Sequence, residues 1–182
     1  MLRVIKNKGT TVKAYQLGSN HEIIKKLMEQ GKIRDLGEGR FAVYSQEAIN
    51  GKEGGEIGVN GDWIKVDGSG CPYPNDKEFF EANHRRIEGD TFEQIPKVFY
   101  AWNRKCEMCP EIRFLMETRG LKINEKSFEQ YYSAKLWGTT EAAAADAMIV
   151  FYDIQYKEDG SVKDVTFNFV ARDAFEKTYS FA

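Results

Sequence analysis

Apolar and polar residues alternate along several short stretches of the chain, which is the pattern of half-buried strands. The predicted strands are Thr11–Gln16, Arg40–Gln46, Trp63–Val66, Phe92–Trp102, Met148–Gln155 and Val165–Val170. Pro96 lies inside the fourth of these, and because proline cannot donate to a strand ladder, we expect an edge strand or a bulge there. Glu158–Ser161 contains Asp-Gly-Ser, so the last two strands are expected to form a hairpin that ends the chain.

In other stretches apolar residues recur every three or four positions, and this period predicts helices. The predicted helices are His21–Gln30, Asp76–Arg86, Glu111–Arg119, Glu125–Trp137 and Ala142–Ala147. Local signals support their ends: Asn75 can cap the second helix, Pro110 suits the start of the third, and Gly120 suits its end.

Together these elements predict an α+β fold, in which short antiparallel strands are packed by four or five helices. The turn-forming segment Glu88–Thr91 divides the chain into two halves of similar size. We expect a first α+β domain over residues 1–88 and a second α+β half over residues 92–182.

Composition narrows the class of protein without naming a function. The chain has 182 residues, 42% of them hydrophobic and 30% charged, as is typical of a globular protein. Lys and Arg (26) nearly balance Asp and Glu (28), and both halves, divided after Tyr100, are close to neutral. This balance counts against nonspecific binding to nucleic acid and against full mimicry of DNA.

Location is predicted from what the sequence lacks. No apolar run approaches the length of a membrane span, and the start MLRVIKNKG has no apolar core or cleavage site of a signal peptide. An odd number of cysteines, three, suits a reducing compartment better than a disulfide scaffold. We therefore expect a cytoplasmic protein that does not associate with membranes.

Cys106 and Cys109 form the one local motif that suggests chemistry, a C-x-x-C pair just before a predicted helix. A thiol at a helix N-terminus can be reactive because the helix dipole lowers its pKa. A thioredoxin also needs a later proline, and none follows position 110; structural zinc needs two further ligands, for which Cys71 and His84 are the best candidates. We expect two partly packed thiols with no cofactor and no metal, and a redox or zinc protein remains an alternative.

Other catalytic arrangements are missing from the sequence. His21 and His84 lie near predicted helix ends, away from any recognisable nucleophile motif, and no Gly-Lys-Ser phosphate loop occurs. We therefore predict no catalytic residue and no enzymatic activity.

Exposed acids and aromatics are the candidates for contacting a partner. The predicted acidic positions are Glu53, Glu56, Glu88, Asp90 and Glu93. The predicted aromatic and basic positions are Tyr100, Trp102, Arg104, Tyr131, Lys135 and Trp137. In the predicted helix Glu125–Trp137, a four-residue spacing places Phe128, Tyr132 and Leu136 on a buried stripe, so Tyr131 and Lys135 should face solvent.

Gly61–His84 resembles a family of small domains encoded by phages and prophages of Gram-positive hosts. The matching positions are Gly61, Asp62, Trp63, Ile64, Gly68, Tyr73, Pro74, Phe80 and Glu81. The family also opens with a strand and a helix similar to Val12–Gln16 and His21–Gln30. Phe175–Tyr179 resembles the family's Phe-Glu-x-x-Tyr ending, which implies that the second half is a diverged, larger copy.

In overall size and organisation the chain resembles the type II-A anti-CRISPR proteins, Cas9 inhibitors encoded by phages of gut clostridia. This resemblance implies binding to Cas9 or the Cas9–guide RNA complex in the infected host, and inhibition of DNA cleavage without sequence-specific contact to nucleic acid. The alternative is an anti-defence protein that sequesters a nucleotide signal, with a pocket between the turn Trp63–Tyr73 and Arg85-Arg86.

Overall fold

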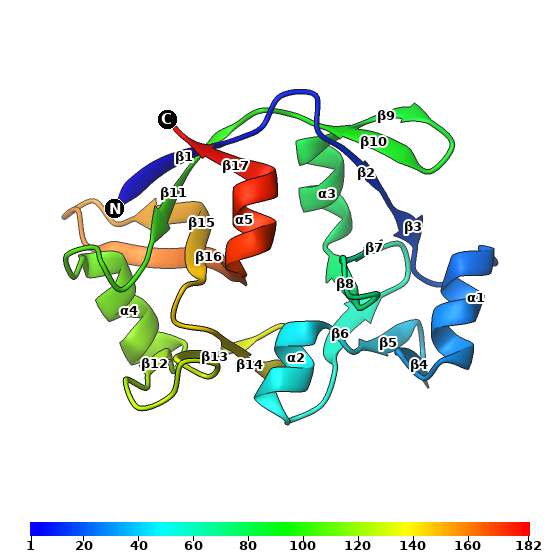
Figure 1. Cartoon of the computed structure of the whole chain (residues 1–182), viewed down its shortest axis with the longest axis horizontal. Helices are drawn as coiled ribbons and strands as arrows, with labels where there is room; N and C mark the ends of the chain where they lie inside the picture. The colour runs from blue at the N-terminus through cyan, green and yellow to red at the C-terminus, as the bar shows by residue number, and fades with distance from the viewer. The chain divides into compact units, whose positions relative to one another are not determined.

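Strands dominate the computed structural model, which describes all residues, Met1–Ala182. Seventeen strands hold 43% of the residues and five helices hold 20%, and the strands form five small antiparallel sheets (Figure 1). The expectation of an α+β fold packed by helices is therefore wrong, and the protein is predominantly β.

The elements alternate along the whole chain. The helices are α1 (Glu22–Glu29), α2 (Gln46–Gly51), α3 (Lys77–Asn83), α4 (Pro110–Thr118) and α5 (Arg172–Thr178). The strands are β1 (Leu2–Lys6), β2 (Thr11–Lys13), β3 (Tyr15–Gln16), β4 (Ile33–Gly37), β5 (Arg40–Val43), β6 (Glu56–Val59), β7 (Trp63–Val66), β8 (Pro72–Asn75), β9 (His84–Glu88), β10 (Thr91–Gln94), β11 (Val98–Trp102), β12 (Lys122–Ile123), β13 (Tyr132–Leu136), β14 (Thr139–Ala143), β15 (Met148–Tyr156), β16 (Val162–Val170) and β17 (Tyr179–Phe181).

The chain forms two compact units, and each unit is made of segments that are not contiguous in the sequence. The first unit contains Met1–Asn7, Pro96–Leu136 and Glu141–Ala182, and the second contains Lys8–Ile95 with Trp137–Thr140. The second unit is therefore largely an insertion between β1 and β11. The division of the chain into domains over residues 1–88 and 92–182 stays a prediction.

A five-stranded sheet with the order β16-β15-β11-β1-β17 organises the first unit. Its central pairing places Val4 opposite Phe99, and both side chains are buried on one face of the sheet. Helix α5 covers this face, where Phe175 packs into the same cluster with Val150 and Tyr179. Figure 1 shows α5 lying against these strands.

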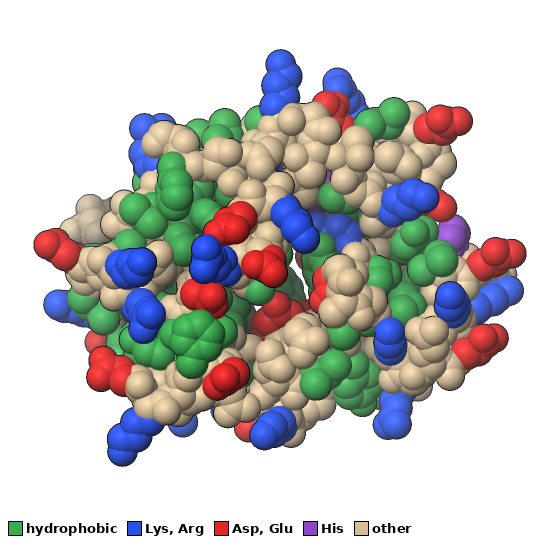
Figure 2. Space-filling model, viewed as in Figure 1, with side chains coloured by type: hydrophobic (Ala, Val, Ile, Leu, Met, Phe, Trp, Pro, Cys, Tyr) green, Lys and Arg blue, Asp and Glu red, His purple; other side chains and the backbone are tan.

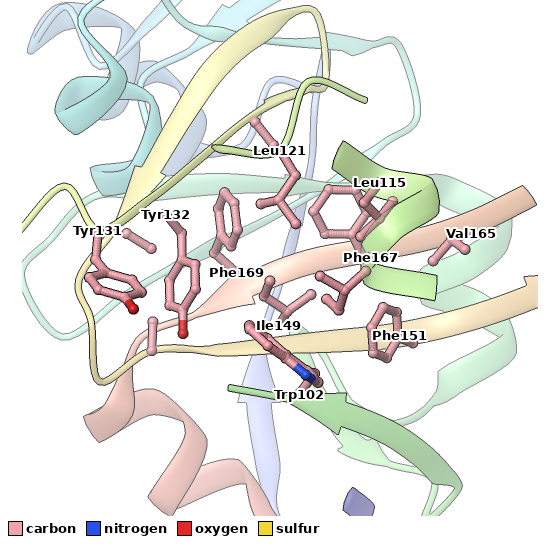
Figure 3. Packing of buried hydrophobic residues seen from close by; sticks show 14 of the residues in the cluster. Trp102, Leu115, Leu121, Tyr131, Tyr132, Ile149, Phe151, Val165, Phe167 and Phe169 are labelled. Atoms are coloured by element: carbon pink, nitrogen blue, oxygen red, sulfur yellow. The ribbon is translucent and has the colours of Figure 1, made fainter. Parts of the chain in front are cut away.

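The opposite face of the sheet carries the largest core of the protein. Ile112 and Leu115 of α4 are fully buried there against Trp102, Ile149 and residues of β16. Figure 3 shows the aromatic rings of this core side by side. The labelled residues are Trp102, Leu115, Leu121, Tyr131, Tyr132, Ile149, Phe151, Val165, Phe167 and Phe169.

The predicted helix Glu125–Trp137 is wrong, because this segment forms a turn followed by β13. The side chains of Asn124 and Ser127 accept hydrogen bonds from backbone amides two and three residues ahead, which favours turns over helix. Tyr132 and Ala134 are then buried on one face with period two. Phe128 is 51% exposed instead of buried, and the predicted helix Ala142–Ala147 is the end of β14 and a turn.

Three small sheets form the second unit, with the orders β2-β10-β9, β3-β7-β8 and β4-β5-β6. Ile24 and Leu27 of α1 pack on a core with Phe41, Val43 and Ile64. A separate aromatic core joins α3 to two of the sheets. It contains Ala14, Trp63, Phe80 and Phe92.

Several predicted elements of the second unit are confirmed, with shifted ends. Helix α1 is present, but His21 is its cap, and its Nδ1 accepts from the amide of Ile23. Helix α3 begins after Asp76 and ends at Asn83, so Arg85 and Arg86 lie on β9 and not in the last helical turn. Helix α2 was not predicted at all. The predicted strand Phe92–Trp102 is broken around Pro96 into β10 and β11.

Helices α3 and α5 end in the same way. Each has seven residues and contains Phe-Glu, and each is followed by an aromatic residue that opens a strand. His84 stacks on Phe80 with ring centroids 4.0 Å apart, and Tyr179 stacks on Phe175 at 5.2 Å. The end of the chain is therefore α5 and β17 instead of the predicted hairpin, and the Phe-Glu-x-x-aromatic pattern has one local geometry in both units.

Gly55 provides a test of close packing in the second unit. A Cβ at this position would lie 3.0 Å from the backbone nitrogen of Val43 and 3.1 Å from its oxygen, and backbone atoms of a paired strand cannot easily move away. We expect Gly55→Ala to lower the free energy of unfolding by about 1–3 kcal/mol, measured by chemical denaturation. The matched control is Gly68→Ala, which would meet no atom within 4 Å and lies outside the left-handed region. Equal stability of the two variants would contradict this packing.

Candidate interaction surfaces

The predicted acidic group lies on the β9–β10 hairpin, and two of its three acids are hydrogen-bonded to basic side chains. Asp90 Oδ2 lies 2.9 Å from His21 Nε2, and Glu93 accepts a hydrogen bond from Arg85, while Glu88 is exposed. Because His21 Nδ1 is the acceptor that caps α1, its Nε2 carries the proton donated to Asp90. This hairpin is therefore a mixed charged surface. Figure 2 shows acidic and basic side chains similarly mixed on the visible face.

The second predicted acidic pair divides into one surface residue and one core residue. Glu53 is exposed and accepts a hydrogen bond from Thr140. Glu56 is only 5% exposed and accepts a hydrogen bond from Ser45, whose Oγ also caps α2 by accepting from Ala48. Glu56 is therefore a structural residue and not available to a partner.

Burial raises the pKa of Glu56 to about 8, since the charged form loses its hydration. The hydrogen bond from Ser45 opposes this rise, and the nearby Glu47 adds to it. The pKa of Glu47 is itself raised, chiefly by burial. At neutral pH the Glu56 carboxyl is mostly protonated, so the second unit holds a neutral acid in its interior.

The predicted aromatic and basic positions also separate into buried and exposed residues. Trp102 is buried, and its indole donates to the Glu107 carbonyl at 2.9 Å. Tyr131, which was expected to face solvent, is buried beneath the guanidinium of Arg104, 5.7 Å from the ring centroid. The sequence prediction failed for Tyr131 because it assumed a helix. The remaining predicted positions are exposed: Tyr100, Arg104, Lys135 and Trp137.

Trp137 occupies a turn that belongs to the second unit. It has a φ of 49° and precedes Gly138 with a φ of 79°, which are the paired positive angles of a tight hairpin turn. Its carbonyl accepts from the Ile57 amide at 2.8 Å, and the Thr139 hydroxyl donates to the Gly54 carbonyl. The exposed indole of Trp137 is therefore held on an ordered backbone.

Tyr100 is exposed on the face of the five-stranded sheet opposite α5, beside the part on which α4 packs. Arg3 is its direct cross-strand neighbour, and Ile5 stands opposite Val98 in the adjacent pair, so the four side chains project from one face. Tyr100 is 42% exposed and Val98 47% exposed, on the face opposite α5. Of these residues the sequence predicted only Tyr100, although exposed Val98 and Tyr100 alternate with buried Phe99 and Ala101 along β11.

Tyr156 belongs to the same face and is fixed by a carboxylate. Its hydroxyl donates to Glu111 Oε1 at 2.7 Å, and this bond, with burial, raises the pKa of Tyr156 to about 12. For Glu111, burial favours the neutral acid, but hydrogen bonds from Tyr156, its own amide and Cys109 lower the pKa overall. Tyr156 is half exposed, and the proximity of its hydroxyl to Tyr100 contributes to its raised pKa. Two exposed phenols are therefore found on this face.

Cys109 has the opposite character to an activated thiol, because its pKa is raised. Cys109 caps α4 without a side-chain hydrogen bond to the helix, and burial raises its pKa. All three thiols are free and half-buried, and Cys106 and Cys109 pack against the main core of the first unit. No group of three or more His, Cys, Asp or Glu side chains is placed to hold a metal ion.

The turn proposed as a nucleotide pocket is closed by the protein's own side chains. Arg86 lies over the rings of Trp63 and Phe92, at 5.5 and 4.7 Å from their centroids, and both rings are buried. In the turn, Asp67 accepts from the amides of Ser69 and Cys71. The aromatic faces on which a base would stack are therefore occupied by Arg86, Phe80 and one another.

No helix has the length and apolar character needed to cross a membrane. Comparison with protein-family models, curated proteins and solved structures finds no match for this chain.

The buried acid predicts a pH dependence of stability. An unfolded glutamate titrates near 4.5, whereas folded Glu56 titrates near 8, so protons favour the folded state. The stability that protonation of Glu56 contributes is complete below pH 4.5, falls as pH rises, and is lost above pH 8. In thermal melts we expect Glu56→Gln to match the parent near pH 5 and to exceed it near pH 9 by on the order of several kcal/mol.

Glu53→Gln is the matched control. Because Glu53 is exposed, this substitution should leave the pH profile of stability unchanged. Parallel pH profiles for the parent and Glu56→Gln would show that Glu56 does not titrate as described.

Proposed function

We propose that this protein is a phage-encoded, non-enzymatic inhibitor that binds the Cas9–guide RNA complex and prevents DNA cleavage. The observation that carries the binding role is the exposed patch on the α4 side of the five-stranded sheet, where Val98, Tyr100 and Tyr156 are exposed. Exposed large aromatic side chains on ordered strands are typical of protein interfaces. The phage origin and the Cas9 partner come from the sequence resemblances.

The chemistry of this face suits a contact of mixed character. Arg3 stands beside Tyr100 across the strand pair, so one cation accompanies the apolar and phenolic groups. Interfaces of this kind favour tyrosine and arginine because both bury a large area and keep a polar end. Because the chain is nearly neutral, it would bind its partner through shape complementarity and burial of aromatic side chains more than through long-range electrostatic attraction.

Inhibition can be tested with purified protein added to guide-loaded Cas9 before a plasmid substrate. We expect dose-dependent protection of the plasmid, and co-purification with Cas9. Tyr100→Ala should weaken inhibition at least tenfold, since a central interface aromatic commonly contributes about 2 kcal/mol to the free energy of binding.

Phe128→Ala is the matched control, because Phe128 is similarly exposed in the same unit but belongs to a loop away from the strands. It should inhibit like the parent protein. Unimpaired cleavage and no binding across several Cas9 orthologues would exclude the Cas9 proposal. In that case melting temperatures measured against a panel of nucleotides would test the sequestration alternative, because a sequestered ligand stabilises its binder.

A further inference from the structure

Four asparagine or aspartate residues are each followed by a glycine, and such a pair can react within the chain. The nitrogen of the glycine amide attacks the side-chain carbonyl carbon of the preceding residue, and a cyclic succinimide forms. The four pairs begin at Asn50, Asn60, Asp67 and Asp159. The fold decides which pair reacts, because the reaction depends on the freedom of the glycine amide and on the donors that face the carbonyl oxygen.

Both asparagine pairs are held in arrangements that oppose ring closure. Asn50 and Gly51 lie within α2, and closing the ring would require the backbone to leave its helical conformation. The Gly61 amide donates to the Leu17 carbonyl at 3.0 Å, so its nitrogen already has a partner. The side chain of Asn60 also packs against two other glycines, which restricts its rotation.

The two aspartate pairs share the sequence Asp-Gly-Ser but differ in their hydrogen bonds. After Asp159, the Gly160 amide donates to the Lys157 carbonyl at 3.0 Å. After Asp67, the Gly68 amide donates no hydrogen bond within the chain, and this glycine is exposed. A Cβ on Gly68 would meet no atom within 4 Å, so a ring has room to close there.

Three donors converge on one oxygen of Asp67. Its Oδ1 accepts from the Ser69 amide at 2.9 Å, the Ser69 hydroxyl at 2.6 Å and the Cys71 amide at 2.9 Å. Oδ1 of Asp159 accepts only from the amide and hydroxyl of Ser161. In a carboxylate the charge is shared by two oxygens, whereas in the tetrahedral intermediate it is concentrated on one. Donors that converge on that oxygen therefore stabilise the intermediate more than the starting group.

We propose that Asp67 converts to isoaspartate through attack by the Gly68 amide. The Gly68 nitrogen bonds to Cγ of Asp67, and one C=O electron pair moves onto Oδ1. Oδ2 then leaves as water, with the amide proton and one proton from solvent, and the succinimide is formed. Water adds to the α-carbonyl carbon of the ring and the N–C bond breaks there, which returns the proton to solvent and leaves Gly68 joined through Cγ. One water leaves and one enters, so no other reactant is needed.

The conversion would change the connection between β7 and β8. The backbone gains a methylene at residue 67, and the free carboxylate is now the former α-carboxyl, so Ser69 and Cys71 lose their acceptor. The exposed turn accommodates this product, because open space surrounds Gly68. Aged protein is therefore expected to contain two forms of the turn. This chemistry is independent of the proposed binding to Cas9.

Incubation of the full chain in H₂¹⁸O at neutral pH for several weeks tests the conversion, because each hydrolysis of the succinimide adds one oxygen from water. Peptide mass spectrometry locates the label, and electron-transfer fragmentation distinguishes isoaspartate from aspartate. In the folded protein we expect Asp67 to gain label and isoaspartate about tenfold faster than Asp159, since it has one more donor and a free nucleophile. In guanidinium chloride the two identical Asp-Gly-Ser segments should react at similar rates.

Two variants test the two features separately. Gly68→Ala places a methyl group beside the attacking nitrogen, in open space and outside the left-handed region, and should slow labelling of Asp67. Ser69→Ala removes one of the three donors and should also slow it, while Asp159 is unaffected in both variants. Equal labelling of Asp67 and Asp159 in the folded protein, a difference that persists in guanidinium chloride, or unchanged labelling of Asp67 in either variant would each overturn the proposal.

Discussion

Antiparallel pairing of β1 on both of its edges is the interaction on which the first unit depends. Five residues near the start of the chain join β11 on one side and β17 on the other, and both partners are distant in sequence. Val4 is consequently buried from every direction, and α5 can close over it. The same placement buries Lys6 beside Phe99 and leaves Arg3 and Ile5 on the opposite face of the sheet.

The sequence predicted an element correctly where local signals determine it, and failed where turn-forming side chains or long-range strand pairing determine it. Local patterns predicted α1, α4, β7 and the β15–β16 hairpin correctly, because each depends on neighbours along the chain. The segment after Asn124 failed, since its helical spacing of apolar residues competed with side-chain turns and with burial of Tyr132 in a sheet. The fold class was wrong for that reason, and because many strands are too short to show a period.

Candidate contact residues were harder to predict than elements. Residue type indicated that Glu56 and Tyr131 would face solvent, but burial depends on partners such as Ser45 and Arg104 that no local pattern reveals. Conversely, Arg3 and Tyr156 reach the face of Tyr100 only through strand register and a bulge in β15. Tyr100 itself was predictable, because a polar aromatic alternates there with fully apolar neighbours.

The insertion of the second unit between β1 and β11 has a consequence for the order of events during synthesis. Lys8–Ile95 is translated before β11 exists, and its ends already meet through the Gln94 amide and the Thr10 carbonyl, so this segment can begin to fold early. Leu2–Lys6, in contrast, must wait about 90 residues for its first partner strand and longer for β17. During that interval the nascent chain carries an unpaired strand with three apolar residues, and such a strand is open to chaperones and to misassociation.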